Sequence, residues 1–107
     1  MGGRQALVIG LNHLDQFAYI GEFSAGASAF NPDQWPATIL GDTAGTNQRL
    51  KLLFLACGTE DTRLDAHNKA DELLKRNNVR HVYFTTPGGH EPKVWRHSLY
   101  EFAQRLF

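Results

Sequence analysis

The sequence has little of what would place it outside the ordinary globular proteins. Its 107 residues include one cysteine, Cys57, so an internal disulfide is excluded. Eleven basic and eleven acidic residues cancel, which gives no sign of the basic face that nucleic-acid binding requires. The longest apolar run, at 52–57, falls far short of the ~20 residues that cross a membrane. We therefore expect one globular domain that binds neither nucleic acid nor membrane.

Metal-binding patterns are also lacking. No H-x-x-x-H or C-x-x-C spacing occurs in the sequence, so we predict no metal site and expect no cofactor. Cys57 is predicted to be a small buried residue at the end of a strand rather than a nucleophile. Four histidines are expected to have structural roles only: His13, His67, His81 and His97.

Strand-like and helix-like segments alternate along the chain. Residues 50–56 (LKLLFLA) are almost continuously apolar, as in a strand buried on both faces of a parallel sheet. Residues 24–49 are rich in small and polar residues, and we predict a surface connection there with a helical turn or two near 33–40. Further strands are predicted at 17–23 and 79–85, and helices at 4–14, 62–77 and 92–106. This order predicts the α/β class, with about three parallel strands and flanking helices.

Two residues with acid–base chemistry follow two of these predicted strands. Asp61 lies in the turn after 50–56, and His90 follows Gly88-Gly89 after 79–85. In a parallel sheet the carboxyl ends of the strands meet at one edge, where ligands bind, so the two side chains can meet. An aspartate that accepts a hydrogen bond from a histidine fixes its tautomer and leaves the other ring nitrogen free to take a proton.

Each of these residues also has a purely structural interpretation. Asp61 could form the turn or cap the following helix through its side-chain oxygen. His90 could be a solvated loop residue. Glu60 is the main rival for the role of the acid. The order of Asp61 and then His90 matches the chain order Ser, acid, His of α/β-hydrolases, which favours the catalytic interpretation.

Short motifs along the chain resemble one group of enzymes. Met1-Gly2-Gly3 followed by a helix resembles the second half of the nucleophile elbow G-x-S-x-G, which in many esterases runs G-x-S-M-G-G. Other matching stretches are 4–7 (RQAL), 17–21 (FAYIG), 50–54 (LKLLF), 57–61 (CGTED), 88–91 (GGHE), 94–96 (VWR) and Leu99. The chain thus resembles the esterase D-like and feruloyl or acetyl-xylan esterase group of α/β-hydrolases, apart from the stretch 28–48.

This resemblance implies a fold and a set of roles. Residues 1–107 would be the C-terminal part of an α/β-hydrolase domain, with a partial sheet. Asp61 matches the acid of the catalytic triad and His90 its general base. Met1 matches the residue whose backbone N–H contributes to the oxyanion hole. The nucleophilic serine of the family would lie one residue before Met1.

Two functions follow as expectations. The first is a serine-type carboxylic-ester hydrolase, acting on a small-molecule ester or on a feruloyl or acetyl group of a plant polysaccharide. This chain would supply the Asp and the His but not the Ser, and would be nearly inactive alone. The alternative is a non-catalytic binding or assembly module that retains part of the fold. Either would leave an exposed strand edge that pairs with an N-terminal half or drives self-association.

Overall fold

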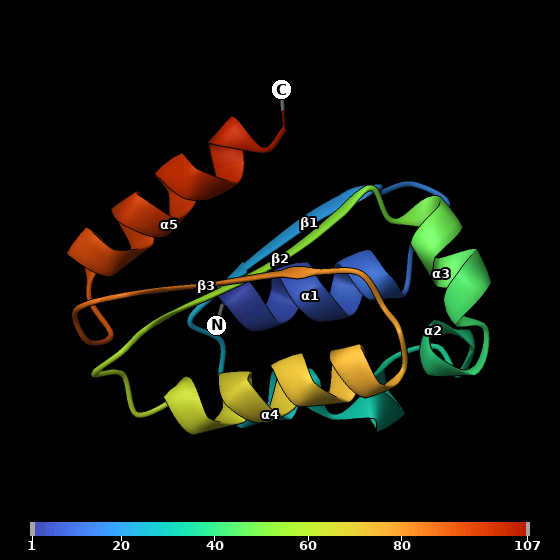
Figure 1. Ribbon diagram of the computed structural model, residues 1–107, viewed down its shortest axis with the longest axis horizontal. Coiled ribbons are helices and arrows are strands. Elements are labelled where there is room, and N and C mark those ends of the chain that lie inside the picture. Colours follow the sequence, from blue (N-terminus) through green and yellow to red (C-terminus); the bar gives the residue numbers. More distant parts are fainter. Residues whose placement is uncertain (1, 107) are drawn as a thin grey trace.

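A three-stranded parallel sheet organises the chain, as seen in the computed structural model, which describes residues 2–106 (Figure 1). The strands are β1 (Tyr19–Phe23), β2 (Leu52–Gly58) and β3 (Val82–Thr86), in the spatial order β1-β2-β3. Both neighbouring pairs are parallel. The central strand β2 is buried from Leu53 onward, which explains its continuous apolar sequence. The predicted α/β class is confirmed.

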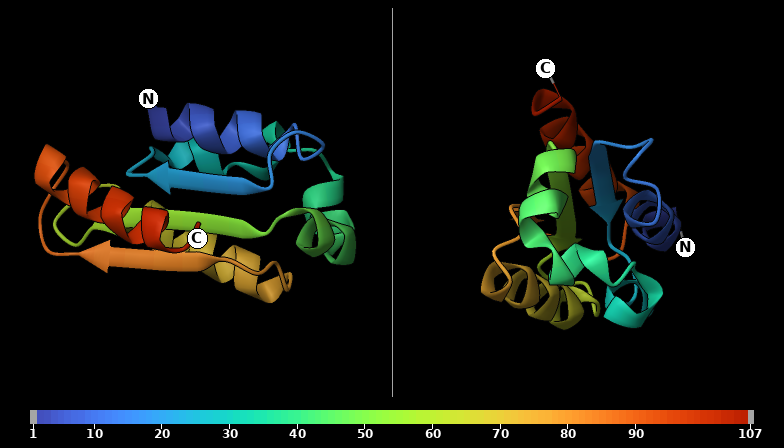
Figure 2. Two further views of the ribbon diagram at one scale, coloured as in Figure 1. Left: turned by 90° about the horizontal axis from the view of Figure 1, so that it is seen from above. Right: turned by 90° about the vertical axis from the view of Figure 1, so that its right-hand side faces the viewer.

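Helices cover both faces of this sheet. α1 (Gly2–Leu11) and α4 (Leu64–Arg76) lie on one face, and α5 (Pro92–Gln104) lies on the other (Figures 1 and 2). Successive residues of a strand point to opposite faces. On β1, therefore, the ring of Phe23 packs against Phe102 of α5, with centroids 6.0 Å apart. The next side chain back along the strand, Glu22, points toward α4 and reaches His67 there.

The connection between β1 and β2 differs from the prediction. It holds four short helices: η1 (Ala27–Phe30), η2 (Pro32–Gln34), α2 (Thr38–Gly41) and α3 (Thr43–Arg49). Trp35 and Ile39 are buried, so the segment is part of the core rather than a surface connection. The helical turns predicted near 33–40 are present as η2 and α2, but the prediction of a surface connection was wrong because single apolar residues among polar ones form no periodic pattern. Side-chain caps, such as that of Asp42 on the Gly45 N–H, begin helices too short for periodicity to detect.

The core lies between the sheet and the α1–α4 layer. Leu7 and Leu11 of α1 and Leu74 of α4 are each no more than 2% exposed. They pack with alternate residues of β2, Leu53 and Leu55. Within residues 2–106, no helix has the length and apolar character needed to span a bilayer.

Two loops at the carboxyl end of the sheet are joined through their backbones. The Thr59 N–H donates to the Thr86 carbonyl and the Glu60 N–H to the Gly88 carbonyl, both at 2.9 Å. A Cβ on Gly58 would lie 2.3 Å from the Gly88 oxygen, so only glycine permits this approach. The loops after β2 and β3 are therefore held side by side. The N-terminus of α1 and the start of α5 lie at the same end (Figure 2).

Candidate active site

Asp61 and His90 meet at this end of the sheet. Nδ1 of His90 lies 2.9 Å from Oδ2 of Asp61. A carboxylate only accepts hydrogen bonds, so Nδ1 carries the proton and donates it. The Asp61 side chain is fully buried, whereas that of His90 is 39% exposed. This tautomer leaves Nε2, on the exposed side of the pair, able to accept a proton.

The second oxygen of Asp61 holds its own turn. Oδ1 accepts from the Arg63 N–H at 2.9 Å and lies 3.5 Å from the Arg63 guanidinium. Burial alone would raise the pKa of Asp61, but the Arg63 N–H and the hydrogen bond and charge of His90 outweigh it and lower that pKa. Asp61 is thus an ionised partner of His90 and also a turn former. It is not the helix cap, because α4 begins at Leu64 with Arg63 in the capping position.

Glu60, the rival acid, is directed elsewhere. Its carboxylate accepts hydrogen bonds from the Gly88 N–H and from the Thr59 hydroxyl. These two bonds lower the pKa of Glu60, the Gly88 N–H having the larger effect. Glu60 therefore braces the two loops against each other, and the carboxylate that contacts His90 is that of Asp61.

A cavity of about 420 Å³ opens beside His90. Gly2 and Gly3, in the first turn of α1, form one wall, so the positive end of the helix dipole lies along the cavity. Ser24 lies at the end of β1, and Trp95 of α5 completes the opposite wall beside His90. The Trp95 and His90 rings meet edge to face, with centroids 5.0 Å apart, which restricts the imidazole. Met1, the predicted oxyanion-hole residue, lies outside the described residues.

Solved structures share this arrangement of strands and helices, although no family model matches the chain. A ferulic acid esterase is similar over 100% of this chain and 49% of its own, with a TM-score of 0.79 and 22% identity. The S-formylglutathione hydrolase FrmB of Staphylococcus aureus covers 100% of this chain and 52% of its own, with a TM-score of 0.78 and 18% identity. The fluorophosphonate-binding serine hydrolase FphF of S. aureus gives a TM-score of 0.77 at 18% identity, over 99% of this chain and 51% of its own.

The chain has a partial α/β-hydrolase fold. It spans about half the length of the structures that it matches. At this low identity the likeness establishes the fold, and the predicted resemblance to this group of esterases is confirmed at that level. The chemistry that this fold supports in the chain depends on the side chains around the cavity.

One residue that lines the cavity beside His90, Ser24, was not predicted from the sequence. Ser24 follows β1 directly and has a φ of 57°, in the left-handed region that serine rarely adopts. Ser24 as a whole is 4% exposed, and its buried Oγ has no hydrogen-bond partner within residues 2–106. A serine at a strand end followed by Ala25-Gly26 was the available signal. The predicted strand 17–23 ends where β1 ends, but Ser24 was assigned to the surface connection 24–49 and was not considered as a site residue.

The remaining histidines and the cysteine lie outside the cavity. His67 is wholly buried against Glu22, and His81 pairs with Asp71 at 2.6 Å. His13 and His97 bond to the Ile9 carbonyl and the Thr86 hydroxyl. Cys57 is buried at the end of β2, as predicted. In the described part of the chain, no three His, Cys, Asp or Glu side chains gather as metal ligands.

Proposed function

We propose that this chain supplies the acid and the base of a serine-type carboxylic-ester hydrolase. The single observation that carries the proposal is the hydrogen bond of 2.9 Å between buried Asp61 and half-exposed His90, at the edge of a cavity. The α/β-hydrolase fold places this pair at the carboxyl ends of parallel strands, where such sites lie. The first turn of α1 faces the same cavity and could stabilise a developing negative charge.

The geometry supports a two-step mechanism. His90 Nε2 takes the proton of a serine hydroxyl while its oxygen attacks the ester carbonyl. The imidazolium, stabilised by ionised Asp61, then returns the proton to the leaving alcohol, and an acyl-enzyme remains. In the second step His90 takes a proton from a water molecule as its oxygen attacks the acyl carbon. His90 then gives that proton to the leaving serine oxygen, which releases the acid and restores the serine and the neutral imidazole. The backbone N–H of Met1 and the start of α1 would bind the negatively charged oxygen.

The nucleophile is proposed to come from outside residues 1–107. The chain has three serines, Ser24, Ser28 and Ser98, and only Ser24 lines the cavity. In the family that the sequence resembles, the nucleophile directly precedes the residue matched by Met1. The first turn of α1 borders the cavity beside His90, so a serine there would lie within reach of the imidazole. The chain alone is therefore expected to be nearly inactive, because losing one triad member removes most of the rate enhancement.

We infer an oxygen ester with a small or aromatic acyl group as the substrate. The name of one similar structure is that of a ferulic acid esterase, which supports an oxygen ester with an aromatic acyl group. That of another refers to S-formylglutathione, a thioester, and supports only the small size of the acyl group. Phe23 and Trp95 line the cavity here and offer aromatic surface to a feruloyl ring. A feruloyl or acetyl group carried on a plant polysaccharide is accordingly the substrate class that we propose.

Hydrolysis of p-nitrophenyl acetate tests this proposal in two settings. The chain alone should turn over the ester no faster than its His90→Ala variant. The chain combined with an N-terminal half that ends in G-x-S should be active and should bind a fluorophosphonate at that serine. In the combined enzyme, Asp61→Asn should lower kcat by about 10⁴-fold, whereas Glu60→Gln should retain most activity. Turnover by the chain alone, lost in Ser24→Ala, would make Ser24 the nucleophile instead.

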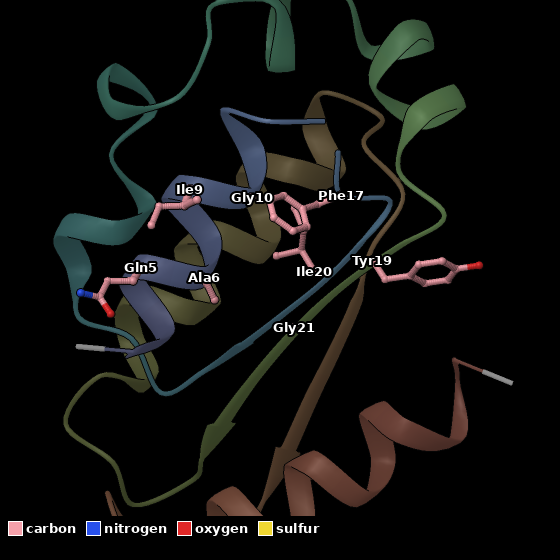
Figure 3. A pocket seen from close by; sticks show the side chains of 8 residues that line it. All are labelled: Gln5, Ala6, Ile9, Gly10, Phe17, Tyr19, Ile20 and Gly21. Carbon is pink, nitrogen blue, oxygen red and sulfur yellow. The ribbon is translucent and has the colours of Figure 1, made fainter. Parts of the chain in front are cut away.

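An apolar groove supports the alternative of a binding or assembly module. It lies between α1 and β1, has a volume of about 290 Å³, and is lined by residues such as Ile9, Phe17 and Ile20 (Figure 3). Ile9 is 52% exposed and Phe17 45%. β1 is also an edge strand, paired only with β2 among the described residues. We propose that this edge and groove receive a strand and helix of an N-terminal half. A clean monomer that binds no such half would count against this use of the edge.

A further inference from the structure

A second acid–histidine pair lies entirely inside the protein, near the proposed catalytic pair. His67 of α4 has its Nε2 2.9 Å from Oε2 of Glu22 on β1, and both side chains have no exposed surface. The same Oε2 accepts the Ala25 N–H at 2.7 Å. The pair therefore joins the carboxyl end of β1 to the first turns of α4. It lies in neither the cavity nor the apolar groove.

A continuous chain of hydrogen bonds leads from this pair to the active site. Nδ1 of His67 lies 2.8 Å from the Arg63 carbonyl, which only accepts, so Nδ1 donates. The N–H of the same Arg63 donates to Asp61 Oδ1 at 2.9 Å. The other oxygen of Asp61 accepts from His90. His67 thus fixes the residue whose amide orients Asp61.

The cost of burying such a pair suggests that it does more than fill space. Removing an acid and a base from water is expensive, and apolar residues of similar size often give equal or greater stability. An apolar side chain at 67, however, would leave the Arg63 carbonyl with the His67 backbone N–H alone, at 3.2 Å, and would remove the shorter side-chain bond that anchors the Asp61 turn. We propose that Glu22 and His67 are positioning residues that hold the Asp61 turn in register with His90. Their part in catalysis rests on the proposed esterase function, whereas their hold on Asp61 does not.

The surroundings of His67 keep both of its ring nitrogens as donors. Burial opposes a charged imidazole, but hydrogen bonds to Cys57 and Glu22 and the charge of Glu22 outweigh it, raising the pKa of His67 to about 10. The groups around it are aromatic or acidic rather than basic: Phe30 and Tyr83 contact the ring at centroid distances of 4.8 and 6.4 Å. At neutral pH the imidazolium can therefore donate to Glu22 and to Arg63 at once.

Replacing His67 by asparagine or by glutamine tests its two donor nitrogens, Nδ1 and Nε2, one at a time. Asparagine places an amide where Nδ1 lies, and this chain already uses that bond: the Asn12 amide donates to the Val8 carbonyl, four residues back, at 2.7 Å. Glutamine instead places its amide near Nε2. Both changes would be made with Glu22→Gln, so that no buried carboxylate is left without a partner. The matched pair is then E22Q/H67N, which keeps the anchor on Arg63, and E22Q/H67Q, which loses it.

The measurement is the titration of the Asp61 carboxyl in the full chain by carbon-13 NMR. In E22Q/H67Q the Asp61 pKa should rise by about one unit, because the Arg63 N–H no longer holds the ionised form firmly. In E22Q/H67N it should stay near the wild-type value. The control is Asp71→Asn, which changes the acid of the Asp71–His81 pair, on the same helix as His67, and should leave Asp61 unchanged.

Two outcomes would overturn the inference. One is an Asp61 pKa that stays at the wild-type value in both double variants, and the other is an equal rise in both. Should E22Q/H67Q fail to fold, single His67→Gln and His67→Asn variants repeat the comparison, with the difference that Asn leaves the Glu22 carboxylate held by the Ala25 N–H alone. In the combined enzyme, E22Q/H67Q should lower kcat more than it alters KM, with recovery in E22Q/H67N. An altered Asp61 titration without any esterase activity would contradict the proposed function and leave the positioning role intact.

Discussion

The buried Glu22–His67 pair should make the stability of this protein fall steeply in alkaline solution. His67 keeps its proton in the folded state up to a pKa of about 10, against an ordinary value of 6.5. Between these values the unfolded state binds one proton fewer than the folded state. The free energy of unfolding must then decrease as pH rises. The stabilisation is complete below pH 6.5 and is lost as pH approaches 10.

The size of the effect follows from the same shift. One proton difference corresponds to a slope of about 1.4 kcal/mol per pH unit. Across the whole interval from 6.5 to about 10 the loss would reach about 5 kcal/mol as an upper value. A domain of this length is typically stable by about 5–15 kcal/mol, so the change should be large enough to measure easily.

Urea unfolding followed by circular dichroism, at intervals from pH 6.5 to 9.5, measures this slope. The comparison is with E22Q/H67Q, in which both titrating groups are replaced by neutral amides of similar shape. Its stability should be nearly constant over the same range, apart from titrations common to both proteins. Equal slopes in the two proteins would refute the reasoning, because His67 would then not keep its proton on folding.

Three further predictions concern the contact between the loops after β2 and β3, the loss of stability in acid, and the exposed groove beside β1. Gly58→Ala should destabilise the protein by about 2 kcal/mol or more in urea unfolding, since its Cβ would lie 2.3 Å from the Gly88 oxygen. Gly41→Ala is the matched control, with nothing within 4 Å of its Cβ, and an equal loss there would show that the loop contact is irrelevant. The lowered pKa of Asp61 means that its stabilisation is present above its ordinary pKa of 3.8 and disappears as pH falls through the folded value. The stability difference between wild type and Asp61→Asn should therefore shrink in acid, and a constant difference down to pH 2 would contradict it. Phe17→Asp should weaken self-association or binding of an N-terminal half, as measured by sedimentation, without lowering the melting temperature by more than a few degrees. Unchanged association would exclude the groove as the contact surface.

Local patterns account for the strands, the long helices and the likeness to α/β-hydrolases. The apolar run at 50–56 specified a buried parallel strand because its residues face covered surfaces on both sides. Polar residues placed directly after two such strands were enough to predict that Asp61 and His90 could meet. The short helices between β1 and β2 were predicted only in part: turns near 33–40 were expected, whereas η1 and α3 were missed, since segments of four to seven residues carry no detectable period.

The tertiary structure decided which acid faces His90 and what surrounds it. Asp61 and Glu60 are neighbours in sequence, and only the path of the turn sends one inward and the other to the Gly88 amide. Likewise Glu22 and His67 are 45 residues apart, so their pairing depends on how α4 lies against β1. Sequence by itself determined the strands, the long helices and the chemistry available at the strand ends. The directions of individual side chains came from packing, because they depend on loop conformation and on contacts between distant segments.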